Sequence, residues 1–273
     1  MRSFTIGNAT VGGPDLLIIA GPCVVESESL CLSIAAELQS LTAARGLPFV
    51  FKASYRKANR SSGRSFTGLP GDEGLAVLAR VRRELGVPVL TDVHEVSEVA
   101  AAAEVADILQ IPAFLSRQTA LLQAAARTGR TVNVKKGQFL APSDMQNAVD
   151  KIVAAGGERI LLTERGTTFG YGDLVVDMRG FVTMRETGWP VLYDATHSLQ
   201  RPGGAETRGD RKFAFPLMRA AVACGVDGLF FEAHPDPDRA LSDAATQLPL
   251  AHAAAFLDEA VRMHTALQEA NRD

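Results

Sequence analysis

Cationic and hydroxyl side chains crowd the segment that follows the apolar residues 48–51. Residues 52–62 include four cations, one amide and three serine hydroxyls. Guanidinium, ammonium and hydroxyl groups bind phosphate or carboxylate well, because each offers donors that match the anionic oxygens. The segment therefore predicts a binding site for a small anionic ligand. The alternative is a solvated basic loop that binds nothing.

Four residues that lie far apart in the sequence have side chains typical of metal ligands. They are Cys23, His197, Glu232 and Asp243. One thiol, one imidazole and two carboxylates suit a borderline divalent ion such as zinc, iron, manganese or cobalt. Each also has a purely structural interpretation: a buried cysteine, a core histidine, a glutamate paired with Arg239, and an aspartate at a helix N-terminus. A metal site requires that the fold bring all four together.

Three further cations extend the anion-binding capacity beyond the first segment. Lys135 and Arg165 each end an apolar run, and Arg117 opens a helical pattern. The alternatives are a surface position for Arg117 and internal ion pairs of the other two with Asp92 or Glu164. A Schiff-base aldolase with Lys135 or its neighbour as nucleophile is less economical, because it leaves the other cations and the metal-ligand types without a role.

Short apolar runs alternate with longer helical patterns along the whole chain. Eight runs are predicted strands: Leu16–Cys23, Phe49–Ser54, Val87–Val93, Ile108–Pro112, Thr131–Lys136, Arg159–Arg165, Val191–His197 and Gly228–His234. Helical periodicity is clearest at Leu30–Leu41, Glu73–Leu85, Gln118–Thr128, Met145–Ala155, Pro216–Cys224 and Ala251–Ala270. Most of these patterns are followed by a glycine, which favours the end of a helix.

Eight strand–helix units within 273 residues predict one closed (β/α)8 barrel, a TIM barrel, as a single domain over residues 1–273. An open doubly wound sheet is the alternative, but no G-x-G-x-x-G turn follows the first predicted strand. The four candidate ligands come from the ends of the first, seventh and eighth predicted strands and from the loop after the eighth. In a barrel the last strand pairs with the first, so Cys23, His197, Glu232 and Asp243 should converge at the carboxyl end, where active sites lie. Residues Arg2–Gly13 alternate apolar and polar types around glycines. We expect them to form a short N-terminal hairpin that plugs the opposite end.

The alternation of side chains along a strand assigns the residues of Thr131–Lys136 to two faces. The apolar Val132 and Val134 should face the surrounding helices. Asn133 and Lys135 then point into the barrel, and Lys136 points away from it. A lysine inside a barrel mouth needs an anionic partner, from either the protein or a ligand.

Composition excludes several other classes of protein. The formal net charge of −3 argues against a nucleic-acid-binding protein. No stretch approaches the roughly 20 consecutive apolar residues of a membrane span, and the first residues lack the apolar core of a signal peptide. The three cysteines form no regular framework, which favours a reducing, cytoplasmic location.

Several of these motifs together resemble the 3-deoxy-D-manno-octulosonate 8-phosphate synthases. The resemblance runs from about Leu16 to Leu250 and rests on the following segments: 19–23 (IAGPC), 51–54 (FKAS), 57–62 (KANRSS), 91–94 (TDVH), 110–114 (QIPAF), 132–139 (VNVKKGQF), 169–171 (FGY), 174–177 (LVVD), 194–198 (DATHS), 232–235 (EAHP) and 240–243 (ALSD). It implies a homotetrameric barrel that condenses phosphoenolpyruvate with D-arabinose 5-phosphate and water and releases phosphate. The product is a precursor of the lipopolysaccharide core.

The resemblance also implies a metal requirement. Metal-independent members of this family carry asparagine at the position of Cys23, so a cysteine there is typical of the metal-dependent form. One divalent metal ion per subunit, and no organic cofactor, is expected. Its implied ligands are Cys23, His197, Glu232 and Asp243.

Residue roles follow from the same motif matches. The residues implied for phosphoenolpyruvate are Lys52, Lys57, Lys135 and Arg165. Those implied for arabinose 5-phosphate are Asn59, Arg60, Ser61 and Arg117, with Asp92 and Gln110 between the two substrates. The expected catalytic residues are Lys57, Asp92, Lys135 and His197.

The chain departs from the family pattern in one region and leaves two rival functions open. Asp173 and Arg201 replace an asparagine and an apolar residue, and residues 205–211 lack the usual serine-glycine-glycine run, which bears on loop closure rather than on the reaction. The related 3-deoxy-D-arabino-heptulosonate 7-phosphate synthases use erythrose 4-phosphate, but their loop typically reads Lys-Pro-Arg-Thr where this chain has residues 57–62. A non-catalytic barrel that senses a phosphorylated metabolite would not need the Cys/His/Glu/Asp set.

Overall fold

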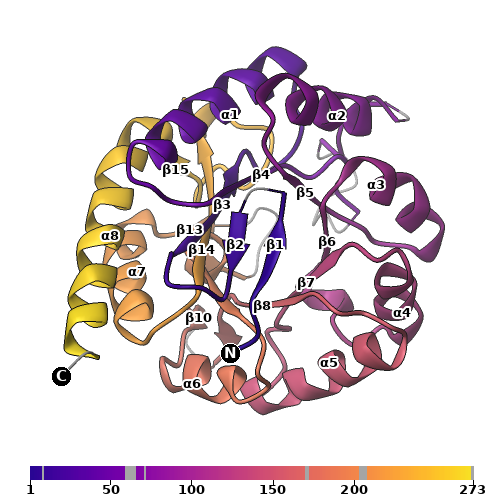
Figure 1. Ribbon diagram of the computed structural model, residues 1–273. Helices are drawn as coiled ribbons and strands as arrows, with labels where there is room; N and C mark the ends of the chain where they lie inside the picture. Colours follow the sequence, from indigo (N-terminus) through magenta and orange to yellow (C-terminus); the bar gives the residue numbers. More distant parts are fainter. Residues whose placement is uncertain (8, 59–65, 71, 170–171, 203–207, 272–273) are drawn as a thin grey trace.

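A closed barrel of parallel strands forms the centre of the molecule. The computed structural model describes residues 1–7, 9–58, 66–70, 72–169, 172–202 and 208–271. Each barrel strand pairs in parallel with the next, and the last one pairs with both its predecessor and the first, which closes the ring (Figure 1). The barrel strands are β3 (Leu17–Gly21), β4 (Phe49–Lys52), β5 (Val89–Asp92), β6 (Ile108–Ile111), β7 (Thr131–Lys135), β8 (Ile160–Glu164), β11 (Val191–Asp194) and β14 (Gly228–His234). The predicted (β/α)8 barrel is confirmed.

Helices surround the barrel on its outside (Figure 1). They are α1 (Glu28–Ala43), α2 (Glu73–Leu85), α3 (Val99–Val105), α4 (Thr119–Arg127), α5 (Met145–Ala154), α6 (Arg179–Arg185), α7 (Ala214–Ala223) and α8 (Ala253–Ala270). The bounds predicted for α2 are confirmed, because Gly86 adopts a left-handed conformation (φ 65°) directly after its last residue. None of the described helices is long and apolar enough to cross a membrane.

Short elements decorate the loops between barrel strands and helices. The 3₁₀ helices are η1 (Val96–Glu98), η2 (Ala113–Leu115), η3 (Pro142–Asp144), η4 (His197–Leu199), η5 (Arg211–Phe213), η6 (Pro237–Arg239) and η7 (Leu250–His252). Two small antiparallel ribbons pair β9 (Thr167–Thr168) with β10 (Leu174–Val175) and β12 (Gln200–Arg201) with β13 (Arg208–Gly209). The strand β15 (Leu248–Pro249) lies outside the ring and pairs in parallel with the last two residues of β14.

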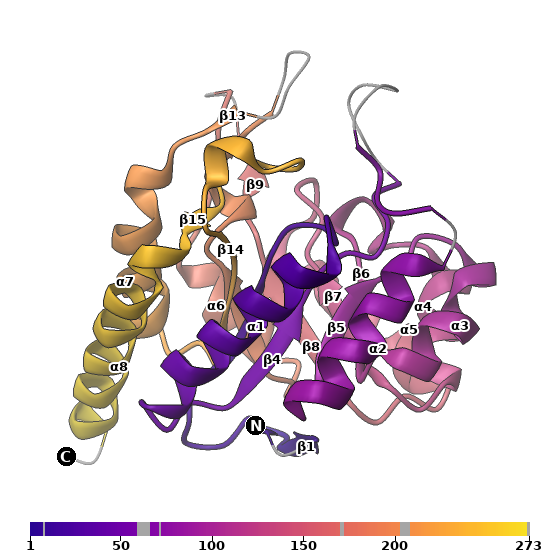
Figure 2. The same cartoon turned by 90° about the horizontal axis from the view of Figure 1, so that it is seen from above.

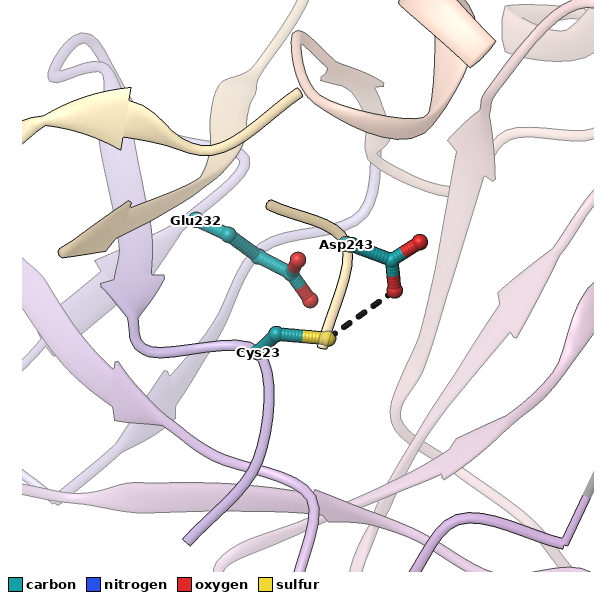
Figure 3. A group of neighbouring side chains, drawn as sticks. All are labelled: Cys23, Glu232 and Asp243. Carbon is teal, nitrogen blue, oxygen red and sulfur yellow. Dashed lines mark hydrogen bonds between the residues drawn. The ribbon is translucent and has the colours of Figure 1, made fainter. Parts of the chain in front are cut away.

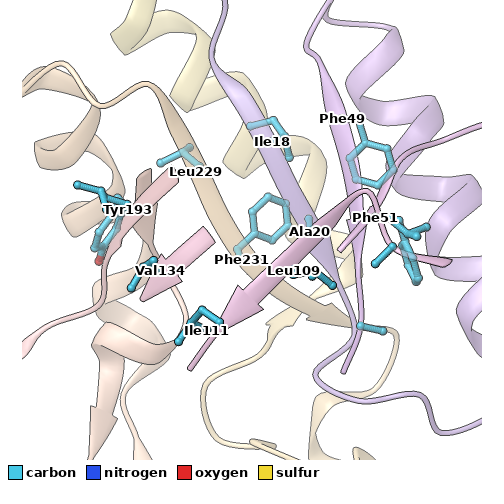
Figure 4. Packing of buried hydrophobic residues seen from close by; sticks show 14 of the residues in the cluster. Ile18, Ala20, Phe49, Phe51, Leu109, Ile111, Val134, Tyr193, Leu229 and Phe231 are labelled. Atoms are coloured by element: carbon cyan, nitrogen blue, oxygen red, sulfur yellow. The ribbon is translucent and has the colours of Figure 1, made fainter. Parts of the chain in front are cut away.

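Alternating side chains of each barrel strand build two apolar cores. The larger core lies between strands and helices and includes Ile18, Ala20 and Phe231 (Figure 4). The smaller core fills the barrel and includes Leu17 and Ile19 of the same strand. A strand that is buried on both faces has a continuous run of apolar residues, which explains why these strands could be predicted from the sequence.

The N-terminal hairpin closes one end of the barrel, as predicted. Strands β1 (Phe4–Ile6) and β2 (Ala9–Val11) pair antiparallel, and Ile6, Ala9 and Val11 join the core inside the barrel. Figure 2 shows the hairpin at the end opposite to the loops that follow the strands. The carboxyl end of the barrel is therefore the open one.

The two faces of β7 agree with the predicted alternation. Val132 and Val134 belong to the core under the helices. Inside the barrel, Asn133 donates a hydrogen bond to the side chain of Gln110, and Lys135 donates one to Asp194 of β11. Lys136 lies outside the barrel, buried, with its Nζ 3.6 Å from a carboxylate oxygen of Glu164.

Candidate active site

Three of the four predicted metal ligands meet at the carboxyl end of the barrel. Ligand atoms of Cys23, Glu232 and Asp243 all lie within 4.8 Å of one another (Figure 3). Cys23 follows β3, Glu232 belongs to β14, and Asp243 lies in the loop after β14. The parallel pairing of β14 with β3 places Glu232 opposite Gly21 and so brings the first two together. The sulfur of Cys23 donates a hydrogen bond to Oδ2 of Asp243 over 3.0 Å.

The thiol of Cys23 is held in a completely buried, polar environment. Its Sγ lies 2.9 Å from Oγ of Ser242, and its backbone N–H donates to Oε1 of Gln247. Burial raises the pKa of Cys23, and the negative charges of Asp243 and Glu232 raise it further. The thiol therefore stays protonated unless a cation offsets those carboxylates.

Asp243 has an unusual backbone conformation. Among the described residues it is the only one other than glycine with a positive φ, at 46°. Aspartate tolerates this region better than most residues, and such strain is typical of functional sites. The interpretation of Asp243 as the start of a helix is wrong, because the next helix is η7 and a turn precedes it. The alternative pairing of Glu232 with Arg239 is also wrong, since Glu232 pairs with Lys52.

His197 lies at the edge of this cluster rather than within it. Its Nδ1 is 2.8 Å from Oδ2 of Asp194, and its Nε2 is 3.6 Å from Oε1 of Glu232. Asp194 also accepts the backbone N–H groups of Thr196 and His197, which fixes the turn that carries the imidazole. The assignment of His197 as a fourth ligand stays a prediction.

The cluster fits a borderline divalent cation. In the part of the chain that the structure describes, Oε2 of Glu232 is buried and has no hydrogen-bond partner. An unsatisfied buried carboxylate oxygen costs free energy, and a bound cation would remove that cost. Thiolate and carboxylate donors, with an imidazole beside them, match the preferences of zinc and its neighbours.

The ammonium group of Lys52 is already engaged by this cluster. Its Nζ is fully buried, pairs with Glu232 and donates to the carbonyl oxygen of Cys23 over 2.9 Å. Lys52 therefore offsets the charge of Glu232 in the structure. Its assignment to phosphoenolpyruvate stays a prediction.

Two cationic residues belong to neighbouring strands of the barrel wall: Lys135 ends β7, and Arg165 directly follows the neighbouring strand β8. Lys135 donates to Oδ2 of Asp194 over 2.7 Å, and burial lowers its pKa to about 8. The buried guanidinium of Arg165 donates through Nη2 to Oε1 of Gln200 over 2.6 Å. Its Nη1 has no partner among the described residues. The ion pairs with Asp92 or Glu164 considered for these side chains are not the ones observed.

Lys57 and Asp92 carry opposite charges on the same side of the barrel mouth. Asp92 is buried, and His94 lies 3.1 Å from its Oδ2. Burial opposes the charge of each group, but His94 and Lys57 lower the pKa of Asp92, and the acidic groups around Lys57 raise the pKa of that lysine. Both groups are therefore charged at neutral pH.

The remaining predicted site residues are less tightly connected. Gln110 is buried inside the barrel, in a polar layer with Asn133 and Thr163. Arg117 is exposed just before α4, where its carbonyl oxygen accepts a hydrogen bond from Lys151, and the structure does not bring it to the other groups. The predicted residues Asn59, Arg60 and Ser61 lie outside the described residues.

Three residues that hold these groups in place were not predicted from the sequence. Asp194 binds both Lys135 and His197, while the amides of Gln200 and Gln247 each bridge two segments. Asp194 is a charged residue within the predicted strand Val191–His197, which is a usable signal. A neutral glutamine in a loop has no spacing or charge pattern that would single it out.

The fold and site define the class of protein. A model of the DAHP synthetase I family matches residues 4–269, and the chain belongs to that family. Three relatives are named 2-dehydro-3-deoxyphosphooctonate aldolase. The one from Trichlorobacter lovleyi is 54% identical over 259 residues, 94% of this chain and 95% of the relative. That from Syntrophotalea carbinolica is 57% identical over 248 residues, 90% of each chain, and that from Geobacter metallireducens is 55% identical over 252 residues, 91% of this chain and 93% of the relative.

Proposed function

We propose that the protein is a 2-dehydro-3-deoxyphosphooctonate aldolase, an enzyme that forms a carbon–carbon bond. It condenses phosphoenolpyruvate with D-arabinose 5-phosphate and water to give 3-deoxy-D-manno-octulosonate 8-phosphate and phosphate, a step toward the lipopolysaccharide core. The observation that carries this proposal is the identity of 54–57% to relatives of that name over at least 90% of this chain. The cationic groups beside a metal-ligand cluster at one barrel mouth support it.

The phosphate of phosphoenolpyruvate is bound by Lys135 and Arg165. These cations lie at the ends of adjacent strands, and Arg165 has a donor with no protein partner among the described residues. C3 of the enol attacks the sugar aldehyde, water adds at C2, and the phosphate leaves by cleavage of the C–O bond. Lys135 and Arg165 stabilise the charge of the departing phosphate, and such preorganised electrostatics is often the largest catalytic contribution.

Lys57 and Asp92 act at the reacting ends of the two substrates. Both are charged, Lys57 interacts electrostatically with Asp92 and with the ligand cluster, and Gln110 is buried inside the barrel. The residues proposed for the sugar phosphate are Asn59, Arg60, Ser61 and Arg117, on the family pattern alone. Holding both substrates in one cavity supplies a large part of the rate enhancement.

One divalent cation per subunit is held by Cys23, Glu232 and Asp243, with His197 as the fourth ligand and no organic cofactor. Such an ion polarises a carbonyl oxygen or lowers the pKa of water. The residues of the chain contribute its position: Asp194 fixes the imidazole of His197, and Lys52 holds Glu232.

The subunits assemble as a homotetramer in the cytoplasm. Phe114 and Phe139 are 59% and 55% exposed, and a Cβ added at Gly137 would meet both Phe139 and Ala113, the residue before Phe114. Phe139, Val175 and Met178 line a pocket of about 670 Å³ there. Exposed apolar surface of this kind is typical of protein–protein interfaces. Three free cysteines support a reducing compartment.

Phosphate release from phosphoenolpyruvate tests the proposal. The assay is run with arabinose 5-phosphate or erythrose 4-phosphate, before and after chelator and re-addition of metal. Turnover with the five-carbon sugar alone, lost in chelator and restored by metal, is expected. Turnover with erythrose 4-phosphate instead would identify the heptulosonate reaction for which the family is named, and no release with either sugar would leave a metabolite sensor.

A further inference from the structure

A single amide connects the anion-binding and cation-binding halves of the candidate site. Oε1 of Gln200 accepts a hydrogen bond from Nη2 of Arg165 over 2.6 Å. Nε2 of the same side chain donates to Oδ1 of Asp243 over 3.0 Å. The side chain of Gln200 therefore links Arg165 to Asp243, two site residues that lie on different segments.

The chemistry of an amide suits this bridge better than other side chains of similar length. Arginine offers only donors and a carboxylate only acceptors, so the amide has one orientation that satisfies both neighbours. A glutamate at this position would repel Asp243, and a lysine would repel Arg165. The bridge therefore depends on a neutral group with one donor end and one acceptor end.

The amide of Gln200 occupies only one polar atom of each partner, and the other one can serve ligand binding. Gln200 occupies Nη2 of Arg165, while Nη1 has no partner among the residues described. It also occupies Oδ1 of Asp243, while Oδ2 is the oxygen that lies 3.0 Å from the sulfur of Cys23. The amide thus orients a donor toward an anion and an acceptor toward a cation.

The backbone of Gln200 is fixed from the other side. Gln200 opens β12 and pairs with Gly209 of β13. A Cβ added at Gly209 would lie 2.1 Å from Cγ2 of Thr246, three residues after Asp243. Strand β13 therefore packs against the turn that carries Asp243, and the glutamine cannot shift without moving that turn.

We propose that Gln200 is a positioning residue that couples the two halves, so that a cation at Cys23, Glu232 and Asp243 strengthens phosphoenolpyruvate binding at Arg165, and the reverse. The assignment of that ligand rests on the proposed function. A coupling free energy is reciprocal, so each ligand changes the affinity of the other by the same factor. Ordering Asp243 through a bound cation orders the amide, and the amide orders Arg165.

The experiment measures binding rather than turnover. Metal-stripped protein is titrated with phosphoenolpyruvate by calorimetry, with and without Co²⁺, and Co²⁺ binding is followed by the absorbance of its bond to the Cys23 thiolate. We expect Co²⁺ to strengthen phosphoenolpyruvate binding by about tenfold in the unmodified protein, a typical coupling. In Gln200→Met, which keeps the length but neither hydrogen bond, the factor should fall below about twofold.

Two further variants keep the result interpretable. Gln200→Glu retains the acceptor for Arg165 but loses the donor to Asp243, so it should lose the coupling even if the methionine variant fails to fold. Gln146→Met removes an exposed amide contact to Asp150 on α5 and should retain the full factor. Steady-state kinetics should show a higher KM for phosphoenolpyruvate in the Gln200 variants, with a smaller change in kcat.

The outcomes separate this inference from the proposed function. Coupling that persists in both Gln200 variants, or is absent from the unmodified protein, would overturn the inference whatever the turnover. Coupling without turnover of arabinose 5-phosphate would retain the inference and overturn the proposed reaction. If phosphoenolpyruvate does not bind, inorganic phosphate replaces it as the probe, and failure of both anions to bind overturns the inference as well.

Discussion

Lys135 lies directly over the face of Phe230 inside the barrel. Its Nζ is 3.1 Å from the centroid of the ring, while Oδ2 of Asp194 accepts its hydrogen bond over 2.7 Å. Burial in this apolar surrounding lowers the pKa of Lys135 to about 8, although Asp194 opposes the shift. The strand-end lysine of the proposed phosphate site therefore titrates close to physiological pH.

The pKa of Lys135 predicts a pH dependence of phosphoenolpyruvate binding. The protonated form attracts the anion, so affinity should be highest below pH 8 and fall by up to about tenfold per pH unit above it. Calorimetry between pH 7 and 9.5 measures this. Lys135→Arg is the control, because a guanidinium stays charged throughout the range and should abolish the inflection. An unchanged inflection in that variant would assign it to another group.

Removal of the Cys23 thiol should lower metal content and activity together. Cys23→Ser replaces a soft ligand by a weak one, and we expect a loss of at least about tenfold in Zn²⁺ affinity with a parallel loss of turnover. Elemental analysis and the phosphate assay measure the two quantities. Cys224→Ser, at the partly buried end of α7, should change neither. Full activity of Cys23→Ser in chelator would show that the metal assignment is wrong.

Asp194 should be important for stability as well as for activity. It is fully buried and accepts hydrogen bonds from both Lys135 and His197. Asp194→Asn leaves a buried ammonium without its counter-ion, and the expected loss in the free energy of unfolding is about 3–5 kcal/mol, measured by urea denaturation. Asp177→Asn breaks an exposed pair with Arg179 and should have little effect. Similar losses in both variants would contradict this account of Asp194.

The N-terminal hairpin should contribute to stability without contributing to catalysis. Gly12 has a φ of 71°, and a Cβ there would lie 2.3 Å from the carbonyl oxygen of Arg2. Gly12→Ala should therefore lower the free energy of unfolding by about 1–3 kcal/mol. Gly13→Ala, where the nearest atom is a side-chain methyl at 3.3 Å, is the matched control. Both variants should retain kcat at 25 °C, because the hairpin lies at the closed end of the barrel.

The sequence predicted those features that depend on strand periodicity and charge. The strands of the barrel are buried on both faces, so each appears as an apolar run, and their polar ends identify the open mouth. The convergence of Cys23 with Glu232 and Asp243 followed from closing the ring. The short helices α3 and α6 were not singled out, because seven residues carry too little periodicity.

The second layer of the site was not predictable for a physical reason. Gln200 and Gln247 are neutral amides whose roles come only from tertiary neighbours. The conformation of Asp243 likewise depends on the packing of its loop. The ion pair of Lys52 with Glu232 could not be predicted either, because the sequence does not show whether a lysine at a strand end binds a ligand or a carboxylate of the protein.

The most direct test of the proposed reaction follows the bridging oxygen of phosphoenolpyruvate. The metal-loaded protein is incubated with arabinose 5-phosphate and with phosphoenolpyruvate that carries ¹⁸O between C2 and phosphorus. The masses of the products are then measured by mass spectrometry. The proposed reaction predicts an eight-carbon phosphorylated keto acid, with the label in the released phosphate because the C–O bond breaks. Label retained in pyruvate, without an eight-carbon product, would show simple phosphate-ester hydrolysis and contradict the proposed condensation.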